Sequence, residues 1–212
     1  MSERNLVVLS AGLSRSSSTR LLADQLSEAA GRALAEAPRI EEIAVGDYAK
    51  DVANTLATGA PGGELRTVLE RLVAADGVIA VTPVYQSSPG GLFKWFFDAV
   101  DEGAVAGKPV LIAATDGAPR HERALEHGIR PMFADLGAEV VPTAVHAASE
   151  DRAYAGESSA PADLVERAAR EFAALVDRRP STCPPQRTRR PRPLGAHARH
   201  GERAVPAAAG SR

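Results

Sequence analysis

Short apolar runs alternate with segments of helical periodicity along most of this chain, and that alternation is the strongest constraint on its fold. Runs such as NLVVLS and GVIAVTPVY are nearly continuous in Val, Ile, Leu and Ala, which is typical of strands buried on both faces of a parallel sheet. Strands are expected in residues 5–10, 39–45, 77–85, 108–117 and 138–145. The order βαβαβαβαβα predicts an α/β domain with helices on both faces of a parallel sheet.

Apolar residues at helical spacing mark the segments between these strands. Leu21, Leu22 and Leu26, for example, recur on one face after Ser18. Helices are expected from Ser18 to near Pro38 and within residues 61–76, 87–101, 121–136 and 160–177, with a short helix around 52–56. Trp95, Phe96 and Phe97 fall in the middle of one helix, and we expect them to face the core or a partner subunit.

The charge distribution divides the chain in two. Residues 178–212 contain nine Arg and one Glu, a net charge of +8, whereas residues 1–177 carry 16 basic and 26 acidic side chains, a net charge of −10. The basic segment is rich in Pro, Arg, Ala and Gly and has few large apolar residues, so it buries too little surface to offset its ordering entropy. We therefore predict a globular domain at 1–177 and a disordered tail at 178–212.

Several function classes are disfavoured by composition. No run of about 18 apolar residues exists, and the start lacks the pattern of a signal peptide. Cys183 is the single cysteine, and no two histidines have the spacing of a zinc helix. The basic tail contains no aromatic residue for base stacking. We expect a cytoplasmic, metal-free protein with no membrane association and no specific nucleic-acid function.

The candidate binding site comes from the rule that a parallel sheet binds ligands at the carboxyl ends of its strands. This rule selects residues 10–19, 82–91 and 114–121. In the first loop, Ser17, Ser18 and Thr19 precede a helix, whose exposed amides and dipole favour an anion, and Arg15 adds charge. A phosphate is the expected ligand, and ordinary helix capping by Ser or Thr is the alternative.

The other two loops suit a planar heterocycle. Pro83, Val84, Tyr85 and Gln86 end the third strand, where extended backbone amides, an aromatic face and an amide side chain are available to a ring. The alternative for Tyr85 is simple packing.

The third loop contains Thr115, Asp116 and Gly117, and Gly117 permits close backbone approach. Asp116 either accepts a bond from a ring N–H or caps the next helix. Arg120 and His121 either face a ligand or lie in solvent.

Three segments together resemble the NADPH-dependent FMN reductases of flavodoxin-like fold. They are AGLSRSSST, PVYQSSPGGLFKWFFD and TDGAPRHE, and the resemblance covers roughly residues 5–176. Within that family, the chain most resembles the actinobacterial reductases that supply reduced flavin to luciferase-like monooxygenases. The resemblance implies a doubly wound, five-stranded parallel sheet of order 2-1-3-4-5.

The resemblance also implies the cofactors and the site. FMN is bound, NADPH or NADH is the reductant, and hydride passes from the nicotinamide to the flavin without an obligatory acid–base residue, so no catalytic residue is named. Residues 13–19 hold the phosphate, and residues 83–87 and the third loop hold the ring. The expected FMN-binding residues are Ser10, Leu13, Arg15, Ser17, Ser18, Thr19, Pro83, Val84, Tyr85, Gln86, Ser87, Thr115, Asp116 and Gly117.

The resemblance further implies a homodimer or tetramer, with the apolar LFKWFF segment as an interface, and a flavin-dependent monooxygenase as partner. Two alternatives have different chemistry: a flavodoxin-like electron carrier without nicotinamide activity, and an FMN-dependent quinone or azo reductase. The chain departs from the family pattern in three places. Ala11-Gly12 replaces Gly-Ser, Gln86 replaces an Asn, and Asp116 stands where the family has a Gly.

Overall fold

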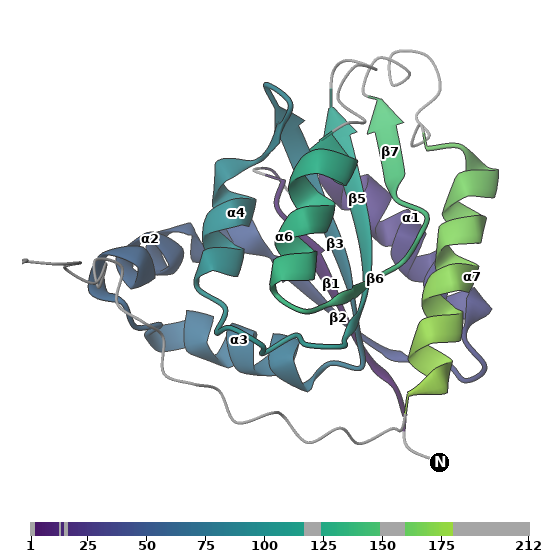
Figure 1. The fold of residues 1–212 in the computed structure, drawn as a ribbon, viewed down its shortest axis with the longest axis horizontal. Coiled ribbons are helices and arrows are strands. Elements are labelled where there is room, and N and C mark those ends of the chain that lie inside the picture. Colours follow the sequence, from purple (N-terminus) through teal and green to yellow (C-terminus); the bar gives the residue numbers. More distant parts are fainter. Residues whose placement is uncertain (1–2, 13, 15–16, 117–123, 149–159, 180–212) are drawn as a thin grey trace, which may run out of the picture.

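A computed structural model of the chain describes residues 3–12, 14, 17–116, 124–148 and 160–179. The sheet has the parallel order β2-β1-β3-β5-β6, with β7 continuing beside β5 and a short β4 paired with β3 (Figure 1). Its strands are β1 (Asn5–Ser10), β2 (Arg39–Ala44), β3 (Gly77–Tyr85), β4 (Ser88–Pro89), β5 (Pro109–Asp116), β6 (Glu139–Val140) and β7 (Val145–Ala148). Counting β6 and β7 as one interrupted strand gives the predicted order 2-1-3-4-5, which is the flavodoxin-like arrangement.

Helices cover both faces of this sheet, as predicted. They are α1 (Ser18–Ala33), α2 (Ala49–Thr58), α3 (Gly63–Ala74), α4 (Gly91–Asp98), α6 (Arg130–Asp135) and α7 (Ala162–Arg178), with a 3-10 turn at Val45–Tyr48 and a π-helical turn at Leu125–Ile129. Helices α1 and α7 pack on one face, and α3, α4 and α6 pack on the other (Figure 1).

The alternation of side chains along each strand supplies both layers of the core. In β1, Leu6 and Val8 pack toward α1 and α7, whereas Val7 and Leu9 pack toward the opposite helices. Both sets are essentially inaccessible to solvent. This is why the strands read as continuous apolar runs rather than as alternating polar and apolar residues.

The fifth strand differs from the prediction of a continuous strand over 138–145. Val110 of β5 pairs with Val140, but Ala113 pairs with Val145, so the fifth strand carries two extra residues between these pairs. Pro142 lies in the interruption and has no backbone N–H to donate to a ladder. Glu171 of α7 holds the gap by accepting bonds from both the backbone N–H and the hydroxyl of Thr143, each at 2.8 Å.

The aromatic residues of α4 divide between the core and the surface. Phe96 and Phe97 are buried, as expected, and Phe97 contacts Phe93 and Phe133 edge to face. Trp95 is 50% exposed, so it is not part of the core of this chain. The reason is helical geometry: neighbouring positions on a helix face different directions, and Phe96 and Phe97 already fill the apolar stripe of α4.

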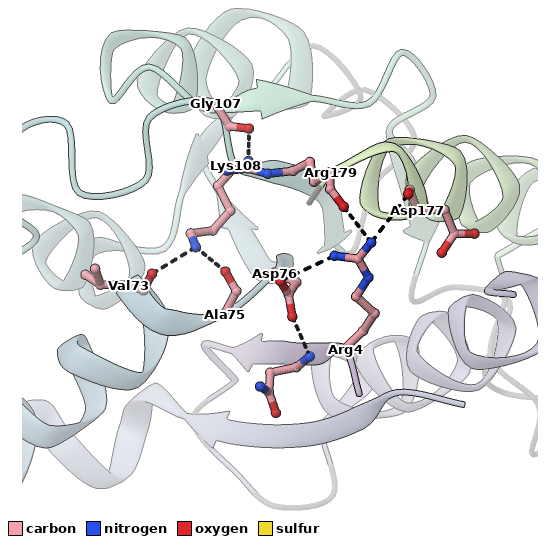
Figure 2. A network of polar contacts seen from close by, with 9 residues as sticks. Arg4, Val73, Ala75, Asp76, Gly107, Lys108, Asp177 and Arg179 are labelled. Carbon is pink, nitrogen blue, oxygen red and sulfur yellow. Dashed lines mark hydrogen bonds and ion pairs between the residues drawn. The ribbon is translucent and has the colours of Figure 1, made fainter. Parts of the chain in front are cut away.

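The amino edge of the sheet, where the parallel strands begin, is tied together by cations (Figure 2). Buried Lys108 donates from Nζ to the carbonyls of Val73, at 3.0 Å, and of Ala75, at the end of α3. Arg4 donates to the carbonyl of Arg179, at 2.6 Å, just past the end of α7. These contacts satisfy helix carbonyls and complement the helix dipoles. The described fold thus reaches Arg179, and the tail from residue 180 lies outside the described residues.

Candidate functional site

The first residues of the three candidate loops lie next to one another at the carboxyl edge of the sheet, where the parallel strands end. They follow β1, β3 and β5, and β3 pairs with β1 on one side and with β5 on the other. The register carries the pairing up to Ser10 opposite Val81 and to Pro83 opposite Thr115. The topology therefore brings together three segments that are far apart in the sequence, at residues 10–19, 82–91 and 114–121.

The first loop ends in a capped helix whose first turn contains no acidic residue. The Ser17 hydroxyl accepts from the backbone N–H of Arg20 at 3.2 Å and so acts as the N-cap. The first N–H groups of the helix are without intrahelical acceptors. Capping and phosphate binding are thus compatible: Ser17 caps the helix start, and the remaining amides and the half-buried Ser18 can serve an anion.

Gly12 makes this loop compact. A Cβ at Gly12 would lie 2.1 Å from the Ser17 hydroxyl oxygen and 2.9 Å from its Cβ, so any side chain here would displace the capping serine. This accounts for one departure from the family pattern: a serine at position 12 does not fit beside the Ser17 of this chain. Leu13 and Arg15, which are also expected to bind the phosphate, lie outside the described residues.

Thr19 is more deeply buried than we expect of a residue that contacts a ligand at the surface. Its hydroxyl is 2.8 Å from the hydroxyl of Thr115, and each residue is only 2% exposed. This bond joins the start of α1 to the end of β5 across β3, and so connects the first loop with the third. Both residues were expected to contact FMN, and the structure pairs their hydroxyls with each other.

The second loop is a two-residue β-hairpin, which was not expected from the sequence. Tyr85 of β3 pairs with Ser88 of β4, and Gln86 and Ser87 between them have φ values of 50° and 62°. Positive φ at both positions is typical of the tight turn that matches strand twist, but Asn and Gly are the usual residues there. Among the described residues these are the non-glycine residues with positive φ, so strain is concentrated at the candidate site.

The side chains of the second loop differ in their exposure, and therefore in whether they can contact a bound ring. Tyr85 is 57% exposed, and Gln86 and Ser87 are exposed, so all three are accessible. Val84 is buried in the core, so its side chain is not available to a ligand. In the third loop Asp116 ends β5, while Gly117, Arg120 and His121 lie outside the described residues.

A crevice of about 610 Å³ adjoins the first loop on the side of β2. Sequence reasoning did not find it, because its walls come from β1, β2, the turn after β2 and the first residues of α1 and α4. Its lining consists of Ser10, Gly12, Ser14, Arg20, Asp24, Glu42, Ala44, Gly46, Asp47, Tyr48, Ala49 and Leu92. The i,i+4 spacing of Arg20 and Asp24 was the one signal available in the sequence.

Arg20 is held in this crevice by two carboxylates. Its Nε donates to Asp24 at 2.7 Å, and its Nη2 forms an ion pair with Glu42. Burial disfavours the charged guanidinium, but the bonds and charges of Asp24 and Glu42 outweigh that cost and raise the pKa of Arg20. Arg20 therefore stays charged and already has anionic partners.

The described donors of the site fit FMN. Hydroxyls and helix amides at the first loop can bind a phosphate, and the accessible hairpin beside it can hold a ring. Within the described residues, no group of three or more His, Cys, Asp or Glu side chains is arranged to hold a metal ion. The described helices likewise include none that is long and apolar enough to span a membrane.

Comparison with known proteins identifies the family. The sequence model of the NADPH-dependent FMN reductases matches residues 4–152. The chain belongs to the NADPH-dependent FMN reductase family. An FMN reductase (NADPH) of Pseudomonas aeruginosa is 36% identical over 146 residues, which are 69% of this chain and 77% of the relative. The NADH-dependent FMN reductase SfnF of Pseudomonas fluorescens is 36% identical over 170 residues, covering 80% and 89%.

Solved structures agree with this assignment. An oxidoreductase from Corynebacterium diphtheriae is 39% identical, with a TM-score of 0.75 over 82% of this chain and 97% of the other. The expected family, flavoprotein chemistry and flavodoxin-like fold are thus confirmed. Family membership makes FMN and a nicotinamide coenzyme the relevant ligands of the reductase site, while its relatives differ in the coenzyme that their names give.

Proposed function

We propose that this FMN reductase transfers a hydride from NAD(P)H to FMN and releases the reduced FMN to a separate flavin-dependent monooxygenase. The observation that carries the reductase function is the convergence of the three family loops at one edge of the sheet, beside a first turn of α1 that contains no acidic residue. The helix amides, Ser17 and Ser18 hold the FMN phosphate, together with Leu13 and Arg15. Residues 83–87 and the loop from Thr115 through Gly117 orient the ring.

The residues of the site act by binding and orientation. Bound FMN supplies the hydride-accepting chemistry, so the protein needs no obligatory acid or base. The buried Thr19–Thr115 bond fixes the phosphate loop relative to the ring loop. The hairpin at Gln86 and Ser87 presents its backbone and side chains at the accessible edge, which leaves room for a nicotinamide to stack on the ring.

Release to a partner is supported by the surface of this chain. The ring-binding hairpin is exposed rather than enclosed, since Tyr85 is accessible and its neighbours at the turn are exposed. An open site of this kind allows FMN to act as a substrate that is exchanged at each turnover. Because reduced flavin reacts with oxygen, its productive consumer is an enzyme that uses it for oxygenation.

Self-association is the second part of the proposal. Trp95 on α4 and Tyr85 at the hairpin are both large, exposed aromatic residues. Exposed aromatics of this size are enriched at protein interfaces. We infer that the α4 surface forms a homodimer contact beside the flavin site. Light scattering coupled to size exclusion should give a dimer or tetramer for the native chain and a smaller species for Trp95→Ala.

The test of the proposed function is a titration of apo-protein with FMN and with riboflavin, followed by NADH and NADPH oxidation in excess FMN. We expect tighter binding of FMN than of riboflavin, and many turnovers per enzyme. Ser17→Ala should reduce the FMN preference, whereas Ser27→Ala, deeper in the same helix, should retain it. FMN binding without coenzyme oxidation would indicate an electron carrier. A single turnover of firmly retained FMN would indicate a quinone or azo reductase.

A further inference from the structure

The crevice beside β2 extends beyond the three loops that account for FMN. It opens at the same edge of the sheet and shares Ser10, Gly12 and Ser14 with the first loop. Its far wall is the turn after β2, where Tyr48 lies, and Leu92 at the start of α4, which directly follows the ring-binding hairpin. A coenzyme whose nicotinamide reaches the flavin ring has an adenosine half that must lie elsewhere on this edge.

The charge of the crevice distinguishes between the two nicotinamide coenzymes. Three carboxylates line it, from Asp24, Glu42 and Asp47, against one described cation, Arg20. Both Asp24 and Glu42 already bind that cation. NADPH carries an additional phosphate on its adenosine ribose, with a charge of about −1.5 to −2. This phosphate would meet net negative charge, whereas a free ribose diol can donate hydrogen bonds to a carboxylate.

The position of Glu42 strengthens this distinction. Glu42 pairs with Val8 and lies two residues before the end of β2, on the strand that neighbours β1. In βαβ dinucleotide sites generally, an acidic residue near the end of the second strand accepts hydrogen bonds from the adenosine ribose, beside the loop that follows the first strand. The β1–α1–β2 unit of this chain has the same connectivity and places Glu42 in a cavity beside that loop.

We propose that this crevice receives the adenosine half of the nicotinamide coenzyme, and that Glu42 accepts hydrogen bonds from its ribose, so that the enzyme prefers NADH to NADPH. The proposal rests on the reductase function and adds its coenzyme specificity. Glu42 is then a specificity residue, while Arg20 positions its carboxylate. Asp24 and Asp47 add the negative charge that rejects the ribose phosphate.

The chain contains a matched control for Glu42. Glu41 is the adjacent residue of β2 and belongs to the opposite face of the sheet, because successive side chains of a strand alternate. It forms an ion pair with Arg71 of α3 at 2.7 Å. Glu41→Gln therefore removes the same charge from the same strand without altering the crevice.

The first experiment measures binding without turnover. Calorimetric titration of the FMN-loaded protein with ADP-ribose and with its 2′-phosphorylated form should show tighter binding of the unphosphorylated ligand. Glu42→Gln should weaken ADP-ribose binding by about tenfold, the value of one hydrogen bond to a charged acceptor. Glu41→Gln should bind both ligands as the native chain does. Equal affinities for the two ligands in the native chain would overturn the proposal.

The second experiment separates this proposal from the reductase function. Reduced nicotinamide mononucleotide has no adenosine half, so its kcat/KM should be the same for the native chain and Glu42→Gln. The NADH-to-NADPH ratio of kcat/KM should fall in Glu42→Gln, and by less in Asp47→Asn, which leaves the Arg20 ion pairs intact. An unchanged ratio in both variants would refute the crevice as the adenosine site. Failure of the native chain to oxidise any of the three donors would instead refute the reductase function.

Discussion

At the amino edge of the sheet, Lys108 and Arg4 donate to backbone carbonyls that end α3 and α7, as Figure 2 shows. At the carboxyl edge the arrangement is reversed: a helix begins there, and Ser17 caps its start. The fold therefore pairs helix carbonyls with cationic side chains at one edge and presents helix donors at the other. Helix polarity explains the difference, since each crossover helix runs antiparallel to its strands.

Backbone conformation differs between the edges in the same sense. Near the amino edge, the turns before β5 and β6 place glycines, Gly107 and Gly137, at positive φ, and their backbones bond to each other at 2.7 Å. At the carboxyl edge Gln86 and Ser87 occupy positive φ without that advantage. Glycines thus occupy the left-handed positions near the amino edge, whereas at the carboxyl edge a less favourable backbone conformation is retained at the proposed ring site.

The largest effect that would test this comparison is expected from Lys108→Met. The substitution keeps an unbranched side chain but leaves two carbonyls at the end of α3 without their cationic donor. We expect a loss of about 2–3 kcal/mol in the free energy of unfolding, with FMN affinity unchanged. Urea denaturation and FMN titration measure the two quantities.

Lys94→Met is the matched control for Lys108→Met. Lys94 lies on α4, is half exposed, and pairs only with Asp98 along its own helix among the described residues. Such a pair contributes about 0.5 kcal/mol or less. A Lys108→Met variant as stable as Lys94→Met, or one that loses FMN binding, would contradict the assignment of the amino edge to stability alone.

A smaller effect, on both stability and FMN affinity, is expected from the pair of hydroxyls of Thr19 and Thr115 at the carboxyl edge. Thr19→Val and Thr115→Val each leave one buried hydroxyl without its partner, at a cost of about 1 kcal/mol in stability. Because the pair connects the phosphate loop to the ring loop, each variant should also weaken FMN binding several-fold. The double variant should cost less than the two single costs added together.

Thr55→Val is the control for this cycle. The Thr55 hydroxyl is also buried, but it donates to the Asp51 carbonyl within α2, away from the loops. Its loss should affect stability and leave FMN affinity unchanged. Strictly additive effects of Thr19→Val and Thr115→Val on FMN affinity would show that the two loops are positioned independently.

The sequence was sufficient to predict a parallel α/β sheet with helices on both faces, because buried parallel strands have a strong local pattern, and the family resemblance supplied the strand order. The binding role of the three loops stays a prediction. The sequence did not reveal the interruption of the fifth strand, whose two extra residues are defined only by pairing with β5. Nor did it reveal the hairpin, since Gln86-Ser87 lacks the Asn or Gly typical of such turns. The crevice was missed because the Arg20–Glu42 ion pair requires α1 and β2 to be placed together.

The smallest effect is expected from Ser87→Gly. A left-handed conformation costs a non-glycine residue about 1–2 kcal/mol, and the greater entropy of glycine in the unfolded chain offsets part of that gain. The net increase in stability should be about 0.5 kcal/mol, with the hairpin geometry retained. Ser88→Gly, at the adjacent strand position, should instead lower stability, because Ser88 has no strain to relieve. Equal losses of stability in both variants would mean that the turn at the proposed ring site is not strained. The two edges would then differ only in their hydrogen bonding and not in backbone strain.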